Sequence, residues 1–258
     1  MPTTTKHLAL LNWANVLAFI LTVLVNGLAG STTILGGKNT AQISDTYPTL
    51  ITPAGYVFSI WGIIYIMLGV FVVYQTFTSA RGKEFQRRIG WLFVLSCLVN
   101  VAWLFLWQFE YLGLSVILMF LLLATLTFIY LRLDIGKSKV STTEKLVVHL
   151  PFSVYLGWIT IASIANVAVT LVSVNWGGFG LDSLVWSTLV IIVALFITLI
   201  VLATRKDVAY ALVIIWALVG ISVKQSENQT VVMLTQMSAV IIAITLVAVI
   251  FLVTIKRK

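Results

Sequence analysis

The stretch Thr52–Gly69, TPAGYVFSIWGIIYIMLG, is apolar enough to begin a membrane span, yet it carries large aromatic side chains with polar atoms. Tryptophan and tyrosine usually lie at the headgroup level of a bilayer, where the ring is in apolar surroundings and the polar atom stays hydrated. Trp61 follows Pro53 by eight residues. In a regular helix that begins at Pro53 and rises about 1.5 Å per residue, the Trp61 indole would therefore lie about 12 Å deeper in the membrane than Pro53. An indole N–H at that depth needs an explanation inside the protein.

The composition of the whole chain is that of a membrane protein. It has 258 residues, of which 60% are hydrophobic and 9% charged, and its mean hydropathy is +1.09. Soluble domains carry about 25% charged residues. Eight apolar stretches are close to the length of about 17–25 residues that crosses a bilayer as a helix. They are Leu8–Gly30, Pro53–Thr76, Ile89–Phe109, Leu112–Leu131, Leu146–Val172, Leu184–Thr204, Val208–Val223 and Val231–Ile255. We expect an all-α, polytopic transmembrane helix bundle of about eight spans.

The distribution of basic residues indicates the orientation of this bundle. With eight spans, both termini and every even-numbered connection lie on one side of the membrane, and 14 of the 16 Lys and Arg residues fall there. Only Lys38 and Lys224 fall on the other side. Basic residues are enriched in cytoplasmic loops. We therefore expect a multi-pass integral protein of the cell membrane with both termini cytoplasmic, and we read the basic charge as a topology signal rather than as nucleic-acid binding.

One connection is much longer than the others. Ser31–Thr52 is rich in Thr, Ser and Gly and falls on the side that carries few basic residues. Loops of this length in compact domains tend to be binding loops or lids. The single cysteine, Cys97, allows no intrachain disulfide, and the sequence contains no His-rich or Cys-rich set that predicts a metal site.

Polar and aromatic residues recur at helical spacing in several spans. The second span carries Phe58, Trp61 and Tyr65 on one face, since they are three or four residues apart. Other members lie on the third and fifth spans: Asn100, Trp103, Trp107, Tyr155, Trp158, Ala162 and Asn166. Facing lipid, amide and indole groups would lack hydrogen-bond partners, so these faces should point inward. Each residue alone could simply bridge two helices. As a set, they indicate the wall of an aromatic pocket.

Three motifs lie in order on the second, third and fifth spans. The first motif is P-x7-W-G-x2-Y-x3-G. Its residues are Pro53, Trp61, Gly62, Tyr65 and Gly69. The other two are N-x-x-W at Asn100 and Trp103, and W-x7-N at Trp158 and Asn166. In this arrangement the first 175 or so residues resemble the tryptophan-rich sensory protein family, also called the translocator protein or TspO/MBR family.

The chain departs from this family in three ways, of which the first is that the aromatic pair after the helix-three Trp is only partly kept, with Trp107 followed by Gln108. Val154 stands where the family has a proline, and Pro151 lies three residues upstream, so a kink of the fifth helix is expected to be displaced. Most members of the family end after five helices, whereas this chain continues. We therefore predict a five-helix transmembrane domain over residues 1–175 and an additional three-helix segment over residues 176–258.

The resemblance implies a membrane receptor or carrier whose pocket, between helices one, two, three and five, binds tetrapyrroles or other polycyclic apolar molecules. The ligand-binding residues that it implies are Phe58, Trp61, Tyr65, Asn100, Trp103, Trp107, Tyr155, Trp158, Ala162, Asn166, Pro48 and Pro53. No cofactor is required, and the bound group implied is a porphyrin or heme. The expected partners are this apolar small molecule and the lipid bilayer. A homodimer is also implied, although the three extra helices would cover the surface by which five-helix relatives dimerise.

Two other classes of function stay open. A coupled transporter would ordinarily carry ionisable groups at mid-membrane, and none of the eight acidic residues is placed there by the predicted spans. A membrane enzyme would need catalytic groups, and the sequence offers no paired carboxylates and no Ser-His-Asp set. We therefore expect no catalytic residues, with breakdown of bound porphyrin as the enzymatic alternative that the resemblance permits.

The charge distribution generates a topology prediction. We expect the termini and the 81–88 connection to be cytoplasmic and the Ser31–Thr52 loop to be external. Single cysteines labelled with a membrane-impermeant maleimide on intact cells test this. Labelling of a cysteine at residue 85 from outside would contradict the eight-span arrangement.

Overall fold

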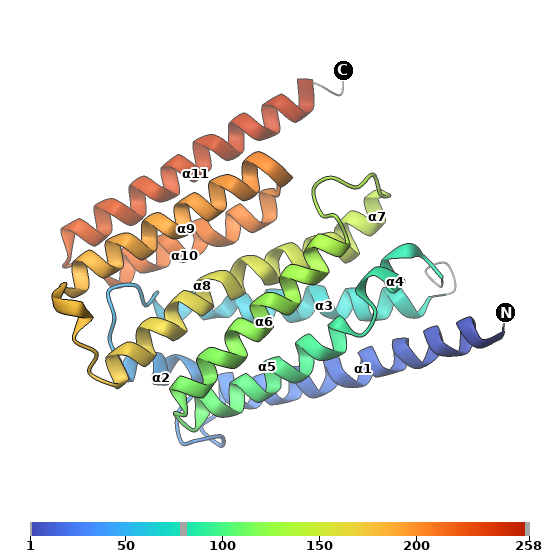
Figure 1. The fold of residues 1–258 in the computed structure, drawn as a ribbon, viewed down its shortest axis with the longest axis horizontal. Coiled ribbons are helices and arrows are strands. Elements are labelled where there is room, and N and C mark those ends of the chain that lie inside the picture. Colours follow the sequence, from blue (N-terminus) through green and yellow to red (C-terminus); the bar gives the residue numbers. More distant parts are fainter. Residues whose placement is uncertain (1, 78–81, 256–258) are drawn as a thin grey trace.

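Long helices run lengthwise through the computed structural model, which describes residues 2–77 and 82–255 (Figure 1). Eight of the helices are long and apolar, and the described residues contain no strand. These helices are α1 (Pro2–Ser31), α3 (Ile60–Thr76), α5 (Leu92–Gln108), α6 (Leu112–Arg132), α8 (Leu150–Ser173), α9 (Ser183–Arg205), α10 (Val208–Lys224) and α11 (Gln229–Ile255). The predicted all-α polytopic bundle is confirmed.

The eight helices correspond in order to the eight apolar stretches of the sequence. Six helical segments among the described residues are long and apolar enough to cross a membrane. The other two, α5 and α10, are apolar helices of 17 residues each. That length is at the lower end of the spanning range.

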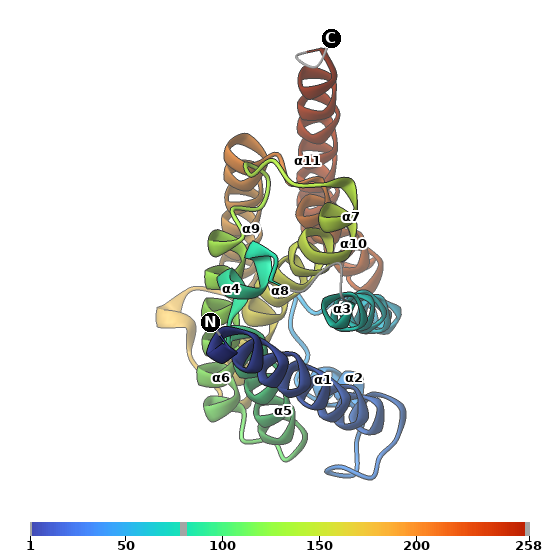
Figure 2. The same ribbon diagram turned by 90° about the vertical axis from the view of Figure 1, so that its right-hand side faces the viewer.

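The connections gather at two ends of the bundle (Figure 1). The end that carries the long 32–59 connection, the α5–α6 turn, the α8–α9 connection and the α10–α11 turn is called the loop end below. Its short elements are α2 (Thr40–Thr46), η1 (Gly55–Ser59) and η4 (Gly178–Gly180). The opposite end, called the terminal end, is where α1 begins and α11 finishes, and it carries α4 (Glu84–Ile89) and α7 (Thr142–Glu144). Figure 2 shows α9 and α11 on one side of α8, and α1 and α5 on the other.

The start of the second span differs from the expected regular helix. Pro53 and Ala54 are extended, η1 is a 3₁₀ helix, and the α-helix begins only at Ile60. The estimate that Trp61 lies about 12 Å down a helix is therefore wrong, because Trp61 is in the first turn of α3. Its ring is half-buried against the aromatic side chains of α5 and α8.

The fifth span also begins irregularly. A π-helical turn, Lys145–His149, leads from α7 into α8, and Pro151 occupies the first turn of α8. Proline lacks an N–H, so the carbonyl that its N–H would have bound is free to enter a wider turn. The displaced irregularity that Pro151 predicted is therefore found just before it.

Phenylalanine side chains fill the interior toward the terminal end. Phe71 of α3 lies with its ring centroid 5.2 Å from both Phe93 of α5 and Phe152 of α8. Phe85 of α4 joins this cluster and is only 1% exposed. A cysteine at residue 85 would thus be shielded from a labelling reagent on either side, and Lys139, exposed between α6 and α7, is the better position for the topology test.

The three C-terminal helices are joined to the other five through α10. At its start, the buried Asp207 carboxylate accepts hydrogen bonds from the Tyr130 hydroxyl of α6 at 2.9 Å and the Ser153 hydroxyl of α8 at 2.7 Å. Near its other end, the Ala54 N–H donates to the Gly220 carbonyl at 3.0 Å, and the Trp216 indole N–H donates to the Val57 carbonyl at 3.2 Å. These contacts cross the predicted boundary at residues 175–176, and the division into two domains stays a prediction.

The packing of α10 on η1 predicts the effect of adding one methyl group. A Cβ at Gly220 would overlap the Val57 side chain, whereas a Cβ at Gly27 of α1 would meet nothing within 4 Å. In a helix, alanine is normally favoured over glycine by about 1 kcal/mol. Overpacking costs about 1–3 kcal/mol, so Gly220→Ala should lower the thermal stability of the detergent-solubilised protein and the matched Gly27→Ala should not. Equal melting temperatures for the two variants would contradict the docking of α10 on η1.

Candidate functional site

Five aromatic rings from α3, α5 and α8 meet near the loop end, with Trp61 in the middle. The Trp61 ring stacks on Tyr65 with centroids 5.5 Å apart and on Trp103 with centroids 6.2 Å apart. It meets the Tyr155 and Trp158 rings edge to face at 6.1 and 6.0 Å. We call these five residues the Trp61 cluster. All four pairs are within the 4.5–7 Å range of favourable aromatic contacts.

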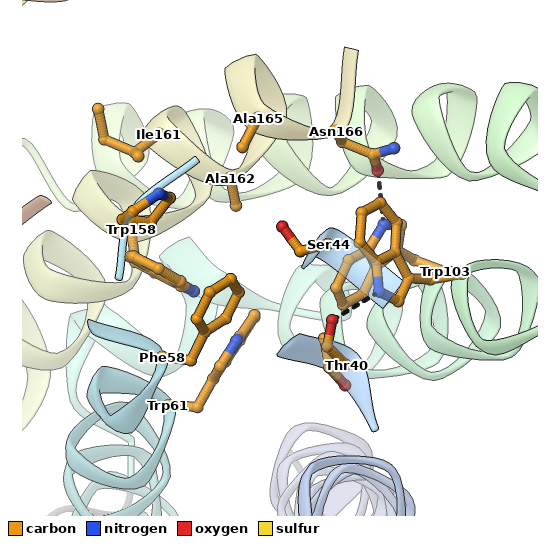
Figure 3. Close-up of a pocket in the computed structure, with 12 residues that line it drawn as sticks. Thr40, Ser44, Phe58, Trp61, Trp103, Trp158, Ile161, Ala162, Ala165 and Asn166 are labelled. Carbon is orange, nitrogen blue, oxygen red and sulfur yellow. Dashed lines mark hydrogen bonds between the residues drawn. The ribbon is translucent and has the colours of Figure 1, made fainter. Parts of the chain in front are cut away.

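A small cavity lies against this cluster (Figure 3). Its volume is about 30 Å³. Its walls include Trp61, Trp103 and Trp158, together with Phe58, whose ring lies edge to face with Trp158 at 5.8 Å. Its other lining residues are Thr40, Ser44, Pro53, Trp107, Ile161, Ala162, Ala165 and Asn166. A space of this size holds about one water molecule, so the aromatic side chains themselves fill the site.

The structure brings most of the predicted ligand-binding residues together. Eight of the twelve line the cavity, and Tyr65 and Tyr155 contact the Trp61 ring. Asn100 is fully buried nearby on α5, where it bonds α1 instead of lining the cavity. Pro48 lies elsewhere, on the wall of a second, larger cavity. That these residues bind a ligand stays a prediction.

Sequence reasoning missed four residues that line the cavity. Thr40 and Ser44 come from α2, a seven-residue helix within the connection expected to be a loop or lid. Its start is marked by a capping box, in which Asn39 and Gln42 bond each other's backbone N–H. That four-residue signal was available in the sequence. Ile161 and Ala165 are small or aliphatic residues of α8, and nothing in their type distinguishes them from packing residues.

Part of the polar chemistry of the site is satisfied within the protein. The Trp103 indole N–H donates to Asn166 Oδ1 at 2.8 Å, and Asn166 Nδ2 donates to the Ser115 hydroxyl of α6 at 2.9 Å. The Trp107 indole N–H donates to the Thr40 carbonyl at 3.3 Å, which ties α2 to α5. These bonds fix the Trp103 and Trp107 rings against α8 and α2.

Three other buried polar groups around the cluster form no hydrogen bond of good geometry among the described residues: the Trp158 indole N–H, the Tyr65 hydroxyl and the Asn100 amide nitrogen. The Asn100 amide does lie close enough to the Tyr65 and Tyr155 hydroxyls to interact with them, so the Trp158 N–H is the atom that is clearly left without a partner. Asn100 uses its oxygen to accept from Asn26 of α1 at 2.7 Å, and it is its Nδ2 that lacks a bond of good geometry. Buried polar groups are nearly always paired, and an unpaired donor costs about 1–3 kcal/mol. A ligand with hydrogen-bond acceptors is the chemistry that would satisfy them.

The 32–59 connection is held over the site through the turn between α5 and α6. Glu110, in that turn, accepts from Lys38 Nζ at 2.9 Å and from the Tyr47 hydroxyl at 2.6 Å. Gln108 Nε2 donates to the carbonyls of Leu35 at 3.1 Å and Lys38 at 2.8 Å. We call these contacts the Glu110 clamp.

Glycine is required at one position beside the clamp. Gly36 has φ of +71°, and a Cβ there would run into the Gln108 carbonyl. The left-handed conformation and the close approach both exclude a larger residue. The connection can therefore lie flat on the end of α5 only with glycine at residue 36.

Electrostatics favour the charged form of the clamp. Hydrogen bonds from Lys38 and from the Tyr47 hydroxyl hold the pKa of the Glu110 carboxyl below its ordinary value, and the positive charge of Lys38 lowers it further. The same hydrogen bond, together with burial and the Glu110 charge, raises the pKa of the Tyr47 hydroxyl. Because both Lys38 and Glu110 are about one-third exposed, their ion pair contributes about 0–1 kcal/mol.

The site holds no set of groups typical of hydrolytic or metal chemistry. Among the described residues, no cluster of three or more His, Cys, Asp or Glu side chains could hold a metal ion. The cavity is lined by apolar, aromatic, hydroxyl and amide groups. Such a lining is suited to binding a flat apolar molecule and orienting it with a few hydrogen bonds.

The fold and the enclosed aromatic cluster define a polytopic, helical membrane protein of a kind that fits ligand binding. A family model described as TSPO-like protein matches residues 12–253, and the chain belongs to that family. The match runs through all eight apolar helices, those after residue 175 included. No curated protein and no solved structure matches the chain.

The Glu110 clamp predicts a loop whose mobility depends on pH. Because the pKa of Glu110 is lowered in the folded state, its stabilising contribution is present above its ordinary pKa of 4.5 and is lost as the pH falls through the lower folded value. Glu110→Gln should therefore speed hydrogen exchange of residues 36–46 at pH 7 by up to about fivefold, which corresponds to about 1 kcal/mol.

The effect should vanish at a pH below the folded pKa of Glu110, where the wild-type carboxyl is also neutral. Glu84→Gln is the matched control, since Glu84 forms an exposed ion pair with Arg88 at the terminal end. Identical exchange in wild type and Glu110→Gln at pH 7 would show that the clamp does not hold the loop.

Proposed function

We propose that the protein is an integral membrane receptor or carrier that binds a tetrapyrrole or another polycyclic apolar ligand at the Trp61 cluster. The observation that carries the proposal is the coincidence of five packed aromatic rings, three of them buried and two half-buried, with buried polar atoms that form no hydrogen bond of good geometry. Rings supply flat apolar contact, and the Trp158 N–H and the Asn100 amide supply directional hydrogen bonds to acceptors such as carboxylates. Membership of the TSPO-like family agrees with this use.

Ligand binding at this site requires the rings of the Trp61 cluster to move apart. Ligand pockets usually measure about 300–1,000 Å³, whereas the cavity measures about 30 Å³. The ligand would therefore take over contacts that the rings now make with one another. Trp61 is the ring best placed to move, because it is half-buried and lies in the first turn of α3, next to the 3₁₀ turn η1.

The orientation proposed from the charges puts the loop end, and with it α2, on the outer side of the membrane. The ligand would then lie beneath α2 and the Glu110 clamp, within the outer half of the bilayer. A proton-coupled transporter has less support, because the buried acid Asp207 lies at the terminal end and its carboxylate is occupied in capping α10.

Replacement of single tryptophans tests the proposal. Trp61→Leu and Trp158→Leu keep the interior apolar but remove one ring, and an aromatic contact is worth about 0.5–1.5 kcal/mol beyond burial. Each variant should bind protoporphyrin or hemin about 2- to 10-fold more weakly, measured by quenching of indole fluorescence. Trp13→Leu is the control, because Trp13 is 66% exposed on α1.

Asn100→Ala and Asn166→Ala separate ligand contact from helix packing. Asn166 is bonded to Trp103 and Ser115, so its loss should chiefly lower thermal stability, by about 1–3 kcal/mol. Asn100 Nδ2 forms no hydrogen bond of good geometry within the protein, so the loss of Asn100 should weaken binding as well. Binding by Trp61→Leu and Trp158→Leu that equals that of Trp13→Leu would overturn the proposal.

A further inference from the structure

A second cavity of about 860 Å³ lies at the loop end, on the side of α8 that faces α9. It is bounded by the second half of α8, the connection from α8 to α9, the first turns of α9, the end of α10 and residues 48–51. The aromatic residues of the Trp61 cluster take no part in its lining. It is therefore a separate site, and its volume is in the range of ligand pockets.

The deep wall of this cavity is an apolar strip along α8. Ile164, Ala168, Leu171 and Val172 line it at spacings of four, three and one residues, with Val190 of α9 opposite. Ile164 and Leu171 are seven residues apart, so at about 1.5 Å per residue the strip is about 10 Å long and runs parallel to the helix axis. The cavity is open to the surface of the bundle, and water gains no hydrogen bonds from such an apolar wall. A hydrocarbon chain fits it.

The mouth of the cavity has a different chemistry. Trp176 and Trp186 line it with ring centroids 5.1 Å apart, and the Trp186 N–H donates to the Gly178 carbonyl at 2.9 Å. Paired indoles beside a loop mark the headgroup level of a bilayer. At the same level lie the polar side chains of Asn175, Lys224 and Gln225.

One cation lies at the mouth of the cavity, and it is paired with a carboxylate. Among the described residues that line the cavity, Lys224 is the one charged side chain. Its ammonium is held 2.9 Å from Asp45, which uses one of its three N–H donors. The other donors are available to a phosphate oxygen.

From this arrangement we propose that the cavity binds one anionic phospholipid of the outer leaflet, with an acyl chain along the α8 strip and the phosphate at Lys224. The apolar strip matches the acyl chain of a lipid, the paired indoles match the interfacial region, and the cation matches the phosphate of the headgroup. Because residues of both α8 and α9 line the cavity, the lipid would fill the space between these helices. The proposal does not depend on what binds at the Trp61 cluster.

Photochemical labelling tests the site in the full-length protein. The protein is reconstituted into phosphatidylcholine vesicles that contain a trace of phosphatidylglycerol with a diazirine in its acyl chain, and adducts are mapped by mass spectrometry. We expect labels on residues 164–172 and 183–190 in excess over those on the exposed face of α11. The same diazirine on phosphatidylcholine should label these residues about 2- to 5-fold less, the preference expected of one half-exposed charge.

Variants assign the label to the cavity. Ala168→Phe fills the strip and should lower the cavity label at least about fivefold, whereas Ala248→Phe, at an exposed alanine of α11, should not. Val190→Trp fills the cavity from the opposite wall and replaces Ala168→Phe if that variant misfolds. Lys224→Gln should abolish the preference for phosphatidylglycerol, and Lys139→Gln, an exposed lysine at the terminal end, should keep it.

Three results would overturn the proposal. The first is a cavity label that survives both filling variants, and the second is equal labelling by the two headgroups in the wild type. The third is displacement of the lipid label by protoporphyrin, which would make this cavity the polycyclic ligand site. Trp61→Leu should leave the lipid label unchanged, so failure here is distinguishable from failure of the function proposed for the Trp61 cluster.

Discussion

The structure depends on one constraint: the hydrocarbon core of a bilayer offers no water to a buried polar atom, so each such atom must find a partner in the protein. The amides on the inward faces do this between helices. Asn15 of α1 donates to Gln75 of α3 at 2.9 Å, and Asn26 of α1 donates to Asn100 of α5 at 2.7 Å. Asn166 of α8 joins α5 and α6 by its bonds to Trp103 and Ser115. The helices of the five-helix part are thus placed by directional bonds, because apolar packing alone is weakly directional in lipid.

The same constraint distinguishes the two halves of the interior. Toward the terminal end the aromatic part of the core is made of phenylalanines, which have no polar atoms, and a network of buried amides lies beside it. Toward the loop end the core is made of indoles and phenols, each of which adds a polar atom that needs a partner. Trp103 and Trp107 have partners, and Trp158 and Tyr65 form no hydrogen bond of good geometry among the described residues. Other unpaired atoms, on Asn15, Gln75 and His149, lie toward the terminal end, so the feature that distinguishes the loop half is its cluster of packed indole and phenol rings.

The C-terminal helices take part in building that half. Trp216 and Gly220 of α10 hold the backbone of residues 54–57, and the side chain of Phe58, the next residue, lines the aromatic cavity. At the other end of α10, Asp207 binds α6 and α8. The family match over residues 12–253 agrees with a unit that includes α10. The sequence motifs pointed to the first five spans only, because the residues that α10 contributes, one indole, one glycine and the carboxylate at its start, form no recognisable motif.

The sequence by itself determined the class of fold, because the backbone N–H and C=O groups of a long apolar stretch find hydrogen-bond partners in a bilayer only when the stretch is a helix. It also placed Trp61, Trp103, Trp158 and Asn166 on inward faces, since helical spacing fixes which side chains share a face. Only the tertiary structure decided that Trp61 lies in the first turn of α3, that α2 supplies Thr40 and Ser44, and that Pro48 lines a different cavity. Those facts depend on how a long connection folds back over the helix ends. Its path is set by contacts such as those of Glu110 and Gln108, which lie about 60–75 residues away in the chain.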